Sequence, residues 1–238
     1  MSRKNSSDDA GKKKEKKAKL VQFRENKKGY HISHLMNFLR VFAYPIHALI
    51  YPFRLHGRKK VGKGACIYVG NHYCIWDVFY PAHTTWEGVH FLAKMSILEA
   101  PILGPVAKKA GVIGAMRDGT DVRTLMDSMR VLKNGEKISM FPEGTRNMKS
   151  DEEFLPFRGG AALMAIKTKT PIVPFVICNR PHVFHMTHVM FGEAIELSEF
   201  YDRKLTPEDY EAADQLLVNR LYELREEYRS MVAAKKRR

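Results

Sequence analysis

The segment ACIYVGNHYCIWD, residues 65–77, places a short apolar run directly before a histidine and a carboxylate. Residues 65–70 are apolar and close on glycine, which is typical of a buried strand. His72 and Asp77 are separated by roughly 140° around a regular helix, so they cannot share one helical face. We expect His72 in the turn after the strand and Asp77 in the first helical turn, its carboxylate reaching back to one ring nitrogen. The other nitrogen is then free to act as a base, although an ordinary hydrogen-bonded histidine beside a helix-favoured acid fits the same spacing.

A second stretch repeats this arrangement farther along the chain. Residues 137–141, KISMF, form another apolar run, which leads into the turn-forming sequence PEGTRN, residues 142–147. Further apolar runs at 112–116 and 172–178 alternate with stretches of helical periodicity. This alternation predicts an α/β fold, with a central, mostly parallel or mixed sheet flanked by helices and with polar side chains at strand ends.

Together these stretches resemble the motifs of the 1-acylglycerol-3-phosphate acyltransferase family of glycerolipid acyltransferases, also called lysophosphatidic acid acyltransferases. Residues 71–77 match an Asn-His-x-x-x-x-Asp box, and residues 141–146 match a Phe-Pro-Glu-Gly-Thr-Arg box. Residues 111–117 and 170–176 are similar to two weaker blocks of the family and come in the same order. The resemblance spans roughly residues 62–197 and agrees with the α/β fold.

The resemblance implies direct transfer of a fatty acyl group from a thioester. His72 takes the proton from a glycerol hydroxyl as that oxygen attacks the thioester carbon, while Asp77 fixes the tautomer of His72. Arg117 and Arg146 each follow a predicted strand, and their planar guanidinium groups suit phosphate oxygens. The expected reaction acylates the sn-2 hydroxyl of lysophosphatidic acid to give phosphatidic acid; glycerol 3-phosphate, another lysophospholipid or an amino-acid lipid is the alternative acceptor.

Other residues of these motifs are expected near the substrate. Glu143 and the backbone of Gly144 and Thr145 are placed to hold the glycerol part. Asn71 is expected as a cap or turn residue, and Lys94 as an addition to a positively charged entrance. The scheme needs no metal or prosthetic group, and the acyl donor, acyl-CoA or an acyl carrier protein, is a substrate.

Two other arrangements of reactive side chains fit the sequence less well. Cys74 lies near His72, but a covalent mechanism needs the base within hydrogen-bond reach of the thiol. His182, His185 and His188 are three residues apart, yet an extended segment with this spacing does not converge on one metal ion. No Gly-x-Ser-x-Gly motif supplies a nucleophilic serine, so the attacking group is expected to come from the substrate.

The basic charge of the chain is concentrated at its ends. Residues 1–30 contain eleven Lys and Arg against four Asp and Glu, and the last four residues are all basic, in a chain of net charge +14. Such tails attract the anionic headgroups of a membrane surface, attract nucleic acid, or remain solvated arms. A basic nucleic-acid-binding protein would leave the two boxes unexplained, so no specific nucleic acid is expected as a partner.

The apolar segment from Ile32 to Phe53 favours the membrane among these partners. Its apolar residues recur at helical spacing, but Arg40, Pro45 and Pro52 interrupt it. No uninterrupted run reaches the roughly 20 residues that a bilayer crossing needs. Two short helices broken near Pro45 and lying in the membrane interface are predicted, with a helical pair packed on the core as the alternative.

We therefore divide the chain into a basic tail (1–30), a helical membrane-interface segment (31–58), an α/β acyltransferase domain (59–232) and a basic tail (233–238). The domain is expected to end in a helix that covers one face of the sheet, beginning near Thr206. Three cysteines and no signal-peptide pattern favour a reducing compartment. The expected location is the cytoplasmic face of a membrane, as a peripheral or monotopic protein.

Overall fold

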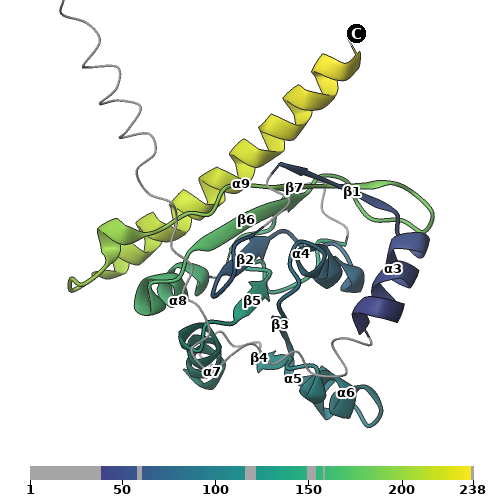
Figure 1. Ribbon diagram of the computed structural model, residues 1–238. Helices are drawn as coiled ribbons and strands as arrows, with labels where there is room; N and C mark the ends of the chain where they lie inside the picture. The colour runs from purple at the N-terminus through teal and green to yellow at the C-terminus, as the bar shows by residue number, and fades with distance from the viewer. Residues whose placement is uncertain (1–38, 58–60, 116–121, 149–153, 158, 237–238) are drawn as a thin grey trace, which may run out of the picture.

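The fold is given by a computed structural model (Figure 1). The structure describes most of the chain from residue 39 onward, in the ranges 39–57, 61–115, 122–148, 154–157 and 159–236. The predicted basic tail at 1–30, residues 31–38 of the predicted membrane-interface segment and Arg117 lie outside these ranges.

A seven-stranded sheet forms the centre of the molecule, in the order β1-β7-β6-β2-β5-β3-β4. The strands are β1 (Phe53–Gly57), β2 (Ile67–Gly70), β3 (Val89–Lys94), β4 (Ile113–Ala115), β5 (Lys137–Met140), β6 (Ile172–Ile177) and β7 (Thr187–Phe191). The five strands from β6 to β4 run parallel, whereas β7 is antiparallel to β6 and parallel to β1. The prediction of a central, largely parallel or mixed sheet is therefore confirmed.

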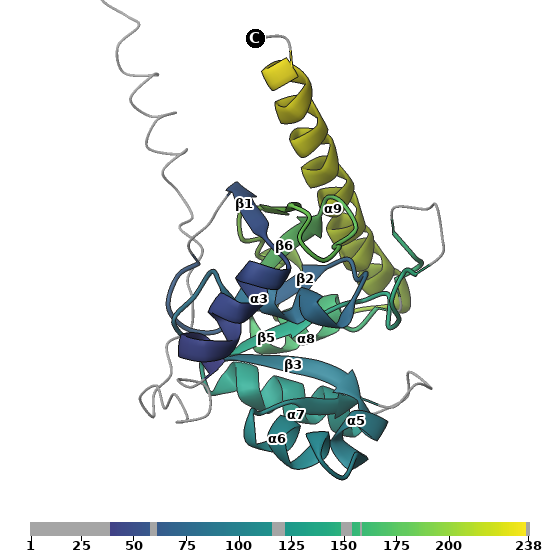
Figure 2. The same ribbon diagram turned by 90° about the vertical axis from the view of Figure 1, so that its right-hand side faces the viewer.

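Helices cover both faces of this sheet, as Figures 1 and 2 show. The longer helices are α7 (Val122–Lys133), α8 (Ala161–Thr168) and α9 (Pro207–Lys236). The shorter ones are η1 (Leu39–Ala43), α3 (Tyr44–Ile50), η2 (Ile75–Val78), α4 (Phe79–Ala82), α5 (Met95–Glu99), α6 (Leu103–Lys109) and η3 (Ser198–Phe200). The three longer helices share one apolar core with the central strands, and α4 packs in the core on the opposite face.

The separation of the apolar clusters onto the two faces of the sheet follows from the alternation of side chains along a strand. In β2, Ile67 and Val69 face the core that contains α7, α8 and α9. Tyr68 faces the other core, where it packs with the side chains of β6 and α4. Gly70 ends β2 at a close approach, because a Cβ atom there would lie 2.5 Å from the ring of Phe175. The end of β2, which carries the NHYCIWD segment, is thus fixed by packing from both faces.

The N-terminal segment differs from the prediction of two helices broken near Pro45. The π-helical turn η1 continues directly into α3, with Pro45 in the first turn of α3. The wider π turn just before Pro45 accommodates a ring that would otherwise clash with a carbonyl of the preceding turn. The predicted break is therefore wrong for the described residues. Phe53, expected at the end of a helical segment, instead begins β1, where it is paired with Thr187.

The last helix, α9, covers the sheet as predicted. Its buried residues Leu217, Leu221 and Leu224 pack against the sheet side of the molecule. The helix continues to Lys236, so residues 233–236 of the expected basic tail are helical, and its C-terminal end projects beyond the sheet (Figure 2). Among the described helices, none combines the length and the apolar character that crossing a membrane requires.

Candidate active site

The candidate site lies where β2 and β5, two adjacent parallel strands, reach their carboxyl ends. His72 follows β2 by two residues, and the segment PEGTRN follows β5. Loops at the carboxyl ends of parallel strands meet at one edge of the sheet, which is where open α/β sheets bind their ligands. The two boxes of the sequence are brought together for this reason.

His72 and Asp77 form the hydrogen bond that their spacing predicted. The Nδ1 atom of His72 lies 2.9 Å from Oδ2 of Asp77. Asp77 stands in the 3₁₀ helix η2, and its fully buried carboxylate also accepts the backbone N–H groups of Tyr73 at 2.5 Å and Cys74 at 2.7 Å. Because an ionised carboxylate only accepts hydrogen bonds, His72 donates from Nδ1, and this leaves Nε2 as the acceptor nitrogen.

The ring of His72 is held flat against Phe141, the first residue after β5. The two ring centroids are 4.1 Å apart, and the ring planes differ by 12°. The side chain of His72 remains 17% exposed. Within the described ranges, no group is hydrogen-bonded to Nε2, and Nε2 is not among the buried side-chain atoms that lack a partner, so it is accessible to solvent. A base with one fixed tautomer and one accessible nitrogen is what general-base catalysis requires.

Glu143 lies beneath the loop of His72. Its carboxylate accepts the backbone N–H of His72 at 3.1 Å and the backbone N–H of Leu155 at 3.3 Å. Burial raises the pKa of Glu143 from 4.5 to about 7, and the nearby Asp77 carboxylate acts in the same direction, whereas the two N–H donors oppose it. Since Glu143 is only 1% exposed, this arrangement favours a role in positioning His72 over the predicted contact with glycerol.

The middle of the PEGTRN turn, residues 144–146, is exposed to solvent, whereas Pro142 and Asn147 at its two ends are buried. Gly144 has a φ of 64°, a left-handed conformation that glycine adopts without strain, and its N–H bonds the carbonyl of Phe141. Thr145 and Arg146 are exposed beside it. The turn ends at Asn147, whose backbone N–H donates to the carbonyl of His72 at 2.7 Å. Gly144, Thr145 and Arg146 are therefore near His72 and open to a ligand.

Asn71 and Lys94, which were also predicted near the substrate, lie in different surroundings, the first buried and the second exposed. Asn71 is buried, and its side-chain amide forms two hydrogen bonds with the backbone of Ile177, at 3.1 Å and 2.8 Å. It therefore joins the ends of β2 and β6 rather than capping a helix. Lys94 is exposed at the carboxyl end of β3, and Arg117 lies outside the described residues.

Arg180 is a cation of this region that the sequence did not indicate. It lies in the loop after β6, where its guanidinium group packs on the ring of Tyr73 at 4.9 Å. Its Nη1 atom donates to the carbonyl of Asn147 at 2.7 Å. The available signal was its position three residues after the end of β6, next to the ends of the other central strands.

The alternative chemistries find little support in the geometry. The thiol of Cys74 donates to Oδ1 of Asp77 at 3.2 Å, and burial together with Asp77 raises its pKa to about 12, so the nucleophilic thiolate is disfavoured. Across the described part of the chain, no three His, Cys, Asp or Glu residues are grouped to hold a metal ion. His188 instead bonds His56, with 2.9 Å between Nδ1 and Nε2.

Several known proteins are similar in sequence to this chain. Relatives include a chloroplastic 1-acyl-sn-glycerol-3-phosphate acyltransferase of Brassica napus, 32% identical over 54% of this chain and 38% of that protein. A 1-acyl-sn-glycerol-3-phosphate acyltransferase of Helicobacter pylori is 30% identical over 53% of this chain and 55% of that protein. The 1-acyl-sn-glycerol-3-phosphate acyltransferase beta of Homo sapiens is 31% identical over 58% of this chain and 50% of that protein. The chain thus matches about half the length of these relatives, or less.

A solved structure and a family model extend the comparison. The structure of a 1-acyl-sn-glycerophosphate acyltransferase from Thermotoga maritima superposes with a TM-score of 0.59 over 79% of this chain and 78% of that one. At 21% sequence identity, this likeness concerns the fold. The family model described as Acyltransferase matches residues 52–178, more than half of the chain and all of the strands from β1 to β6. This chain belongs to the acyltransferase family.

Proposed function

We propose that this protein transfers a fatty acyl group from an acyl thioester to the sn-2 hydroxyl of lysophosphatidic acid and so makes phosphatidic acid. The observation that carries the proposal is the hydrogen bond between His72 and Asp77, which leaves Nε2 of His72 open at the entrance of the site. The names of the relatives, all 1-acyl-sn-glycerol-3-phosphate acyltransferases, support this acceptor.

The reaction follows from the geometry of His72. Nε2 takes the proton of the acceptor hydroxyl as the oxygen forms a bond to the thioester carbonyl carbon. Asp77 stabilises the imidazolium that results, because its carboxylate already accepts the Nδ1–H. The carbon–sulfur bond then breaks, and the proton on Nε2 passes to the departing thiolate. The acceptor itself is the nucleophile, in keeping with a protonated Cys74.

The acceptor phosphate requires fixed cations near the entrance. Arg146 is exposed on the turn that also contains Gly144 and Thr145, and its planar guanidinium group is suited to two phosphate oxygens. Arg117 is proposed as a second phosphate ligand on the grounds of its motif, and Lys94 adds positive charge at the end of β3. The scheme uses acyl-CoA or an acyl carrier protein as the donor and no metal or prosthetic group.

The lipid substrates place the enzyme at a membrane surface, and we assign it to the cytoplasmic face as a peripheral or monotopic protein. The basic charge of the chain, +14 overall, favours anionic phospholipid as the surface that it binds. The exposed apolar residues of η1 and α3 lie on the described part of the N-terminal segment. They support a membrane contact through this segment.

The test measures thiol release and phosphatidic acid formation on liposomes, with and without lysophosphatidic acid. The intact protein is expected to form phosphatidic acid, and His72→Ala is expected to lose about 10²–10⁴-fold in turnover. Circular dichroism of the variant shows that its loss does not come from unfolding. Thiol release without an acylated lipid would point to another acceptor. A folded His72→Ala protein with near-native turnover would refute the assigned base.

A further inference from the structure

The loop between β6 and β7 exposes an aromatic side chain in a strained backbone conformation. Phe184 is 73% exposed and has a φ of 59°, in the left-handed region that bulky residues rarely adopt. Its N–H donates to the carbonyl of Ile50 at 2.7 Å, so the loop is tied to the end of α3. Val183 and Met186, on either side, are also exposed. The fold thus holds an apolar tip in solvent instead of turning it inward.

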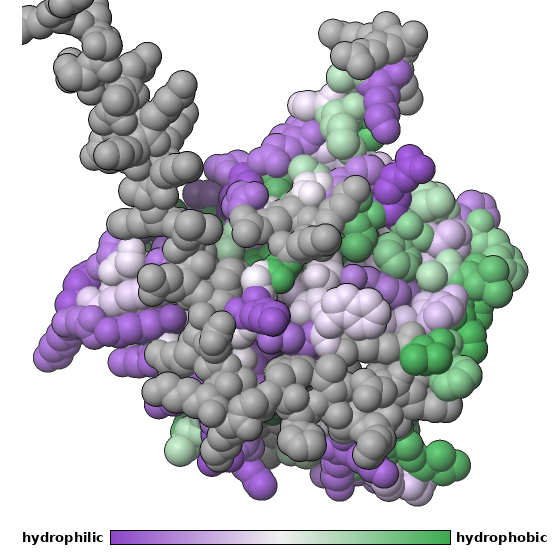
Figure 3. Space-filling model, viewed as in Figure 1, coloured by the Kyte–Doolittle hydropathy of each residue, from purple (hydrophilic) through white to green (hydrophobic). Residues whose placement is uncertain are grey.

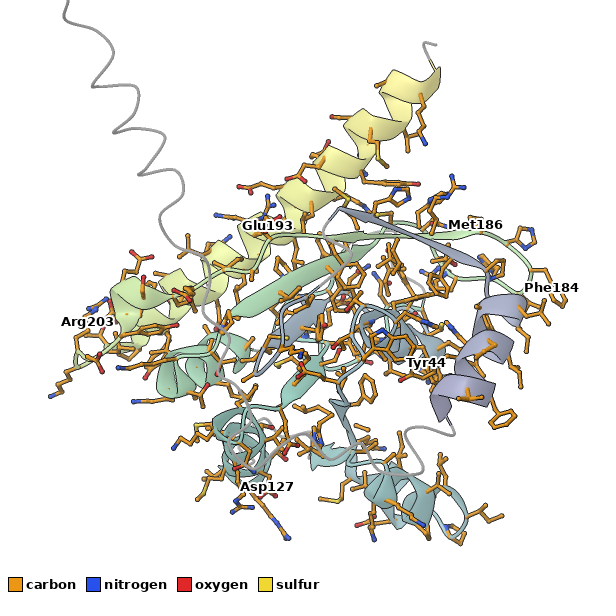
Figure 4. All side chains as sticks on the ribbon, in the orientation of Figure 1. Tyr44, Asp127, Phe184, Met186, Glu193 and Arg203 are labelled. Carbon is orange, nitrogen blue, oxygen red and sulfur yellow. The ribbon has the colours of Figure 1, made fainter. Side chains whose placement is uncertain are left out.

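This tip continues an apolar face on the N-terminal helices. Phe42, Ile46 and Leu49 are spaced by four and three residues, so they share one side of η1 and α3, and all three are exposed. Figure 4 shows Phe184 and Met186 projecting from the loop beside the end of α3. In Figure 3 the apolar colour gathers on this side of the molecule, where α3 and the loop meet.

The same surface reaches the candidate active site through Trp76. The ring of Trp76 lies 5.8 Å from the ring of Tyr51, which follows α3, and 6.3 Å from the ring of His47 within it. Trp76 and its neighbour Ile75 remain partly exposed, and Asp77 is the next residue. The apolar surface therefore extends from the loop and α3 to the helix η2 that holds the partner of His72.

The charge around this surface indicates which partner covers it. Residues 39–57 and 179–191 contain no Asp or Glu, whereas they contain Arg40, Arg54 and Arg180. A surface of exposed Phe, Trp and aliphatic residues with basic neighbours and no acids suits the interface of a bilayer with anionic headgroups. An aromatic side chain there gains apolar contact with lipid chains while the basic groups stay at headgroup level.

We infer that residues 182–186 form a second membrane-inserting element, which enters the bilayer interface together with the exposed face of η1 and α3. With two elements from distant parts of the chain in the same interface, the orientation of the molecule on the membrane is fixed, and Nε2 of His72 lies beside the lipid surface. The expected benefit to catalysis rests on the proposed function. The inferred binding to lipid rests on the exposed apolar surface alone and does not depend on that function.

The experiment compares the full-length protein with Phe184→Asn in sedimentation with vesicles of phosphatidylcholine and phosphatidylglycerol. Asparagine tolerates the left-handed conformation, so this substitution removes the aromatic ring without adding backbone strain. Its partition onto vesicles is expected to fall at least about tenfold. Met126→Gln is the matched control, because Met126 is an exposed apolar residue of α7, away from the loop, and its loss is expected to leave binding unchanged.

A second readout separates membrane binding from chemistry. On a short-chain lysophosphatidic acid that stays monomeric, Phe184→Asn is expected to keep native turnover, whereas turnover on vesicles falls together with binding. If the protein sediments normally but acylates neither substrate, the proposed function fails while the inference about the loop stands. Equal sedimentation of Phe184→Asn, Met126→Gln and the unaltered protein would overturn the inference, as would the absence of vesicle binding by the unaltered protein.

Discussion

Replacing Glu143 with glutamine tests how the buried carboxylate supports the loop of His72. The pKa of Glu143 lies at about 7 instead of 4.5, chiefly because burial disfavours the charged form. At roughly 1.4 kcal/mol for each tenfold change in the ionisation constant, ionising this group in the folded protein costs about 3 kcal/mol. Between these two pH values the folded state binds more protons than the unfolded chain, so the free energy of unfolding falls as pH rises from about 4.5 to about 7.

The Glu143→Gln variant has no titrating proton at this position, so its free energy of unfolding does not fall with pH for this reason. The glutamine amide, however, has only one acceptor oxygen. The backbone N–H groups of His72 and Leu155 each donate to a different oxygen of the Glu143 carboxylate, so one of them would lose its acceptor. Leaving one of them without an acceptor costs about 1–3 kcal/mol at every pH. We therefore expect the variant to be less stable than the unaltered protein near pH 5 and to reach or exceed its stability near pH 8.

Urea unfolding followed by circular dichroism at both pH values measures this change. The stability difference between the two proteins is expected to move by about 2–3 kcal/mol in favour of the variant between pH 5 and pH 8. Other titrating groups occur in both proteins and cancel in the comparison. Glu211→Gln, an exposed substitution on α9, serves as the control and should show no such movement. A constant difference between Glu143→Gln and the unaltered protein at both pH values would refute the reasoning.

Three further substitutions have defined outcomes. Asp77→Asn is expected to lower turnover by about 10²–10⁴-fold, because a neutral amide no longer stabilises the imidazolium of His72. It is also expected to lower Tm, because three N–H donors lose a charged acceptor and an amide nitrogen at the position of Oδ1 would face the thiol of Cys74. Kinetics and thermal unfolding measure both, and near-native turnover would contradict the role of Asp77. Asn71→Ala removes two hydrogen bonds to Ile177 and should lower the free energy of unfolding, measured in urea, by about 2–3 kcal/mol. Its KM should stay unchanged; a raised KM in a stable variant would indicate contact with the substrate. Burial lowers the pKa of His47 to about 4, so stability is expected to fall as pH drops from about 6.5 toward 4. His47→Phe should make that part of the urea-unfolding profile shallower without removing it, because burial also lowers the pKa of the neighbouring His83 to about 4. An unchanged profile would count against this reasoning.

The parts of the site that were predictable from sequence are those fixed by short-range geometry. His72 and Asp77 are five residues apart, which excludes a shared face of one regular helix, and a histidine in the turn with the acid in the first helical turn brings the carboxylate to Nδ1. The parallel centre of the sheet followed from the alternation of strands and helices, since parallel neighbours need crossover connections. Both features depend on residues that are close in sequence or on a repeated pattern.

The features that were missed depend on contacts between distant segments. Asn71 finds Ile177 at a separation of 106 residues, and no local pattern indicates that pairing. β1 is a strand because it lies beside β7, not because residues 53–57 alternate in polarity. Helix α6 contains Gly104 and Pro105 in its first turn, residues that indicate a loop when read locally.

The geometry around His72 gives a physical reason for finding the two boxes together. Apart from Nε2, each polar atom of His72 has a partner: Nδ1 bonds Asp77, the backbone N–H bonds Glu143, and the carbonyl accepts the N–H of Asn147. The ring is packed on Phe141. Three of these four partners come from the stretch FPEGTRN, so this segment positions the base as well as forming the entrance of the site. Nε2 of His72, the proposed base, is thus held in one place, and the entropy of orienting it is already lost on folding. Under the proposed function, what remains variable is the access of a lipid substrate to Nε2, and we expect that access to depend on how the protein lies on a membrane surface.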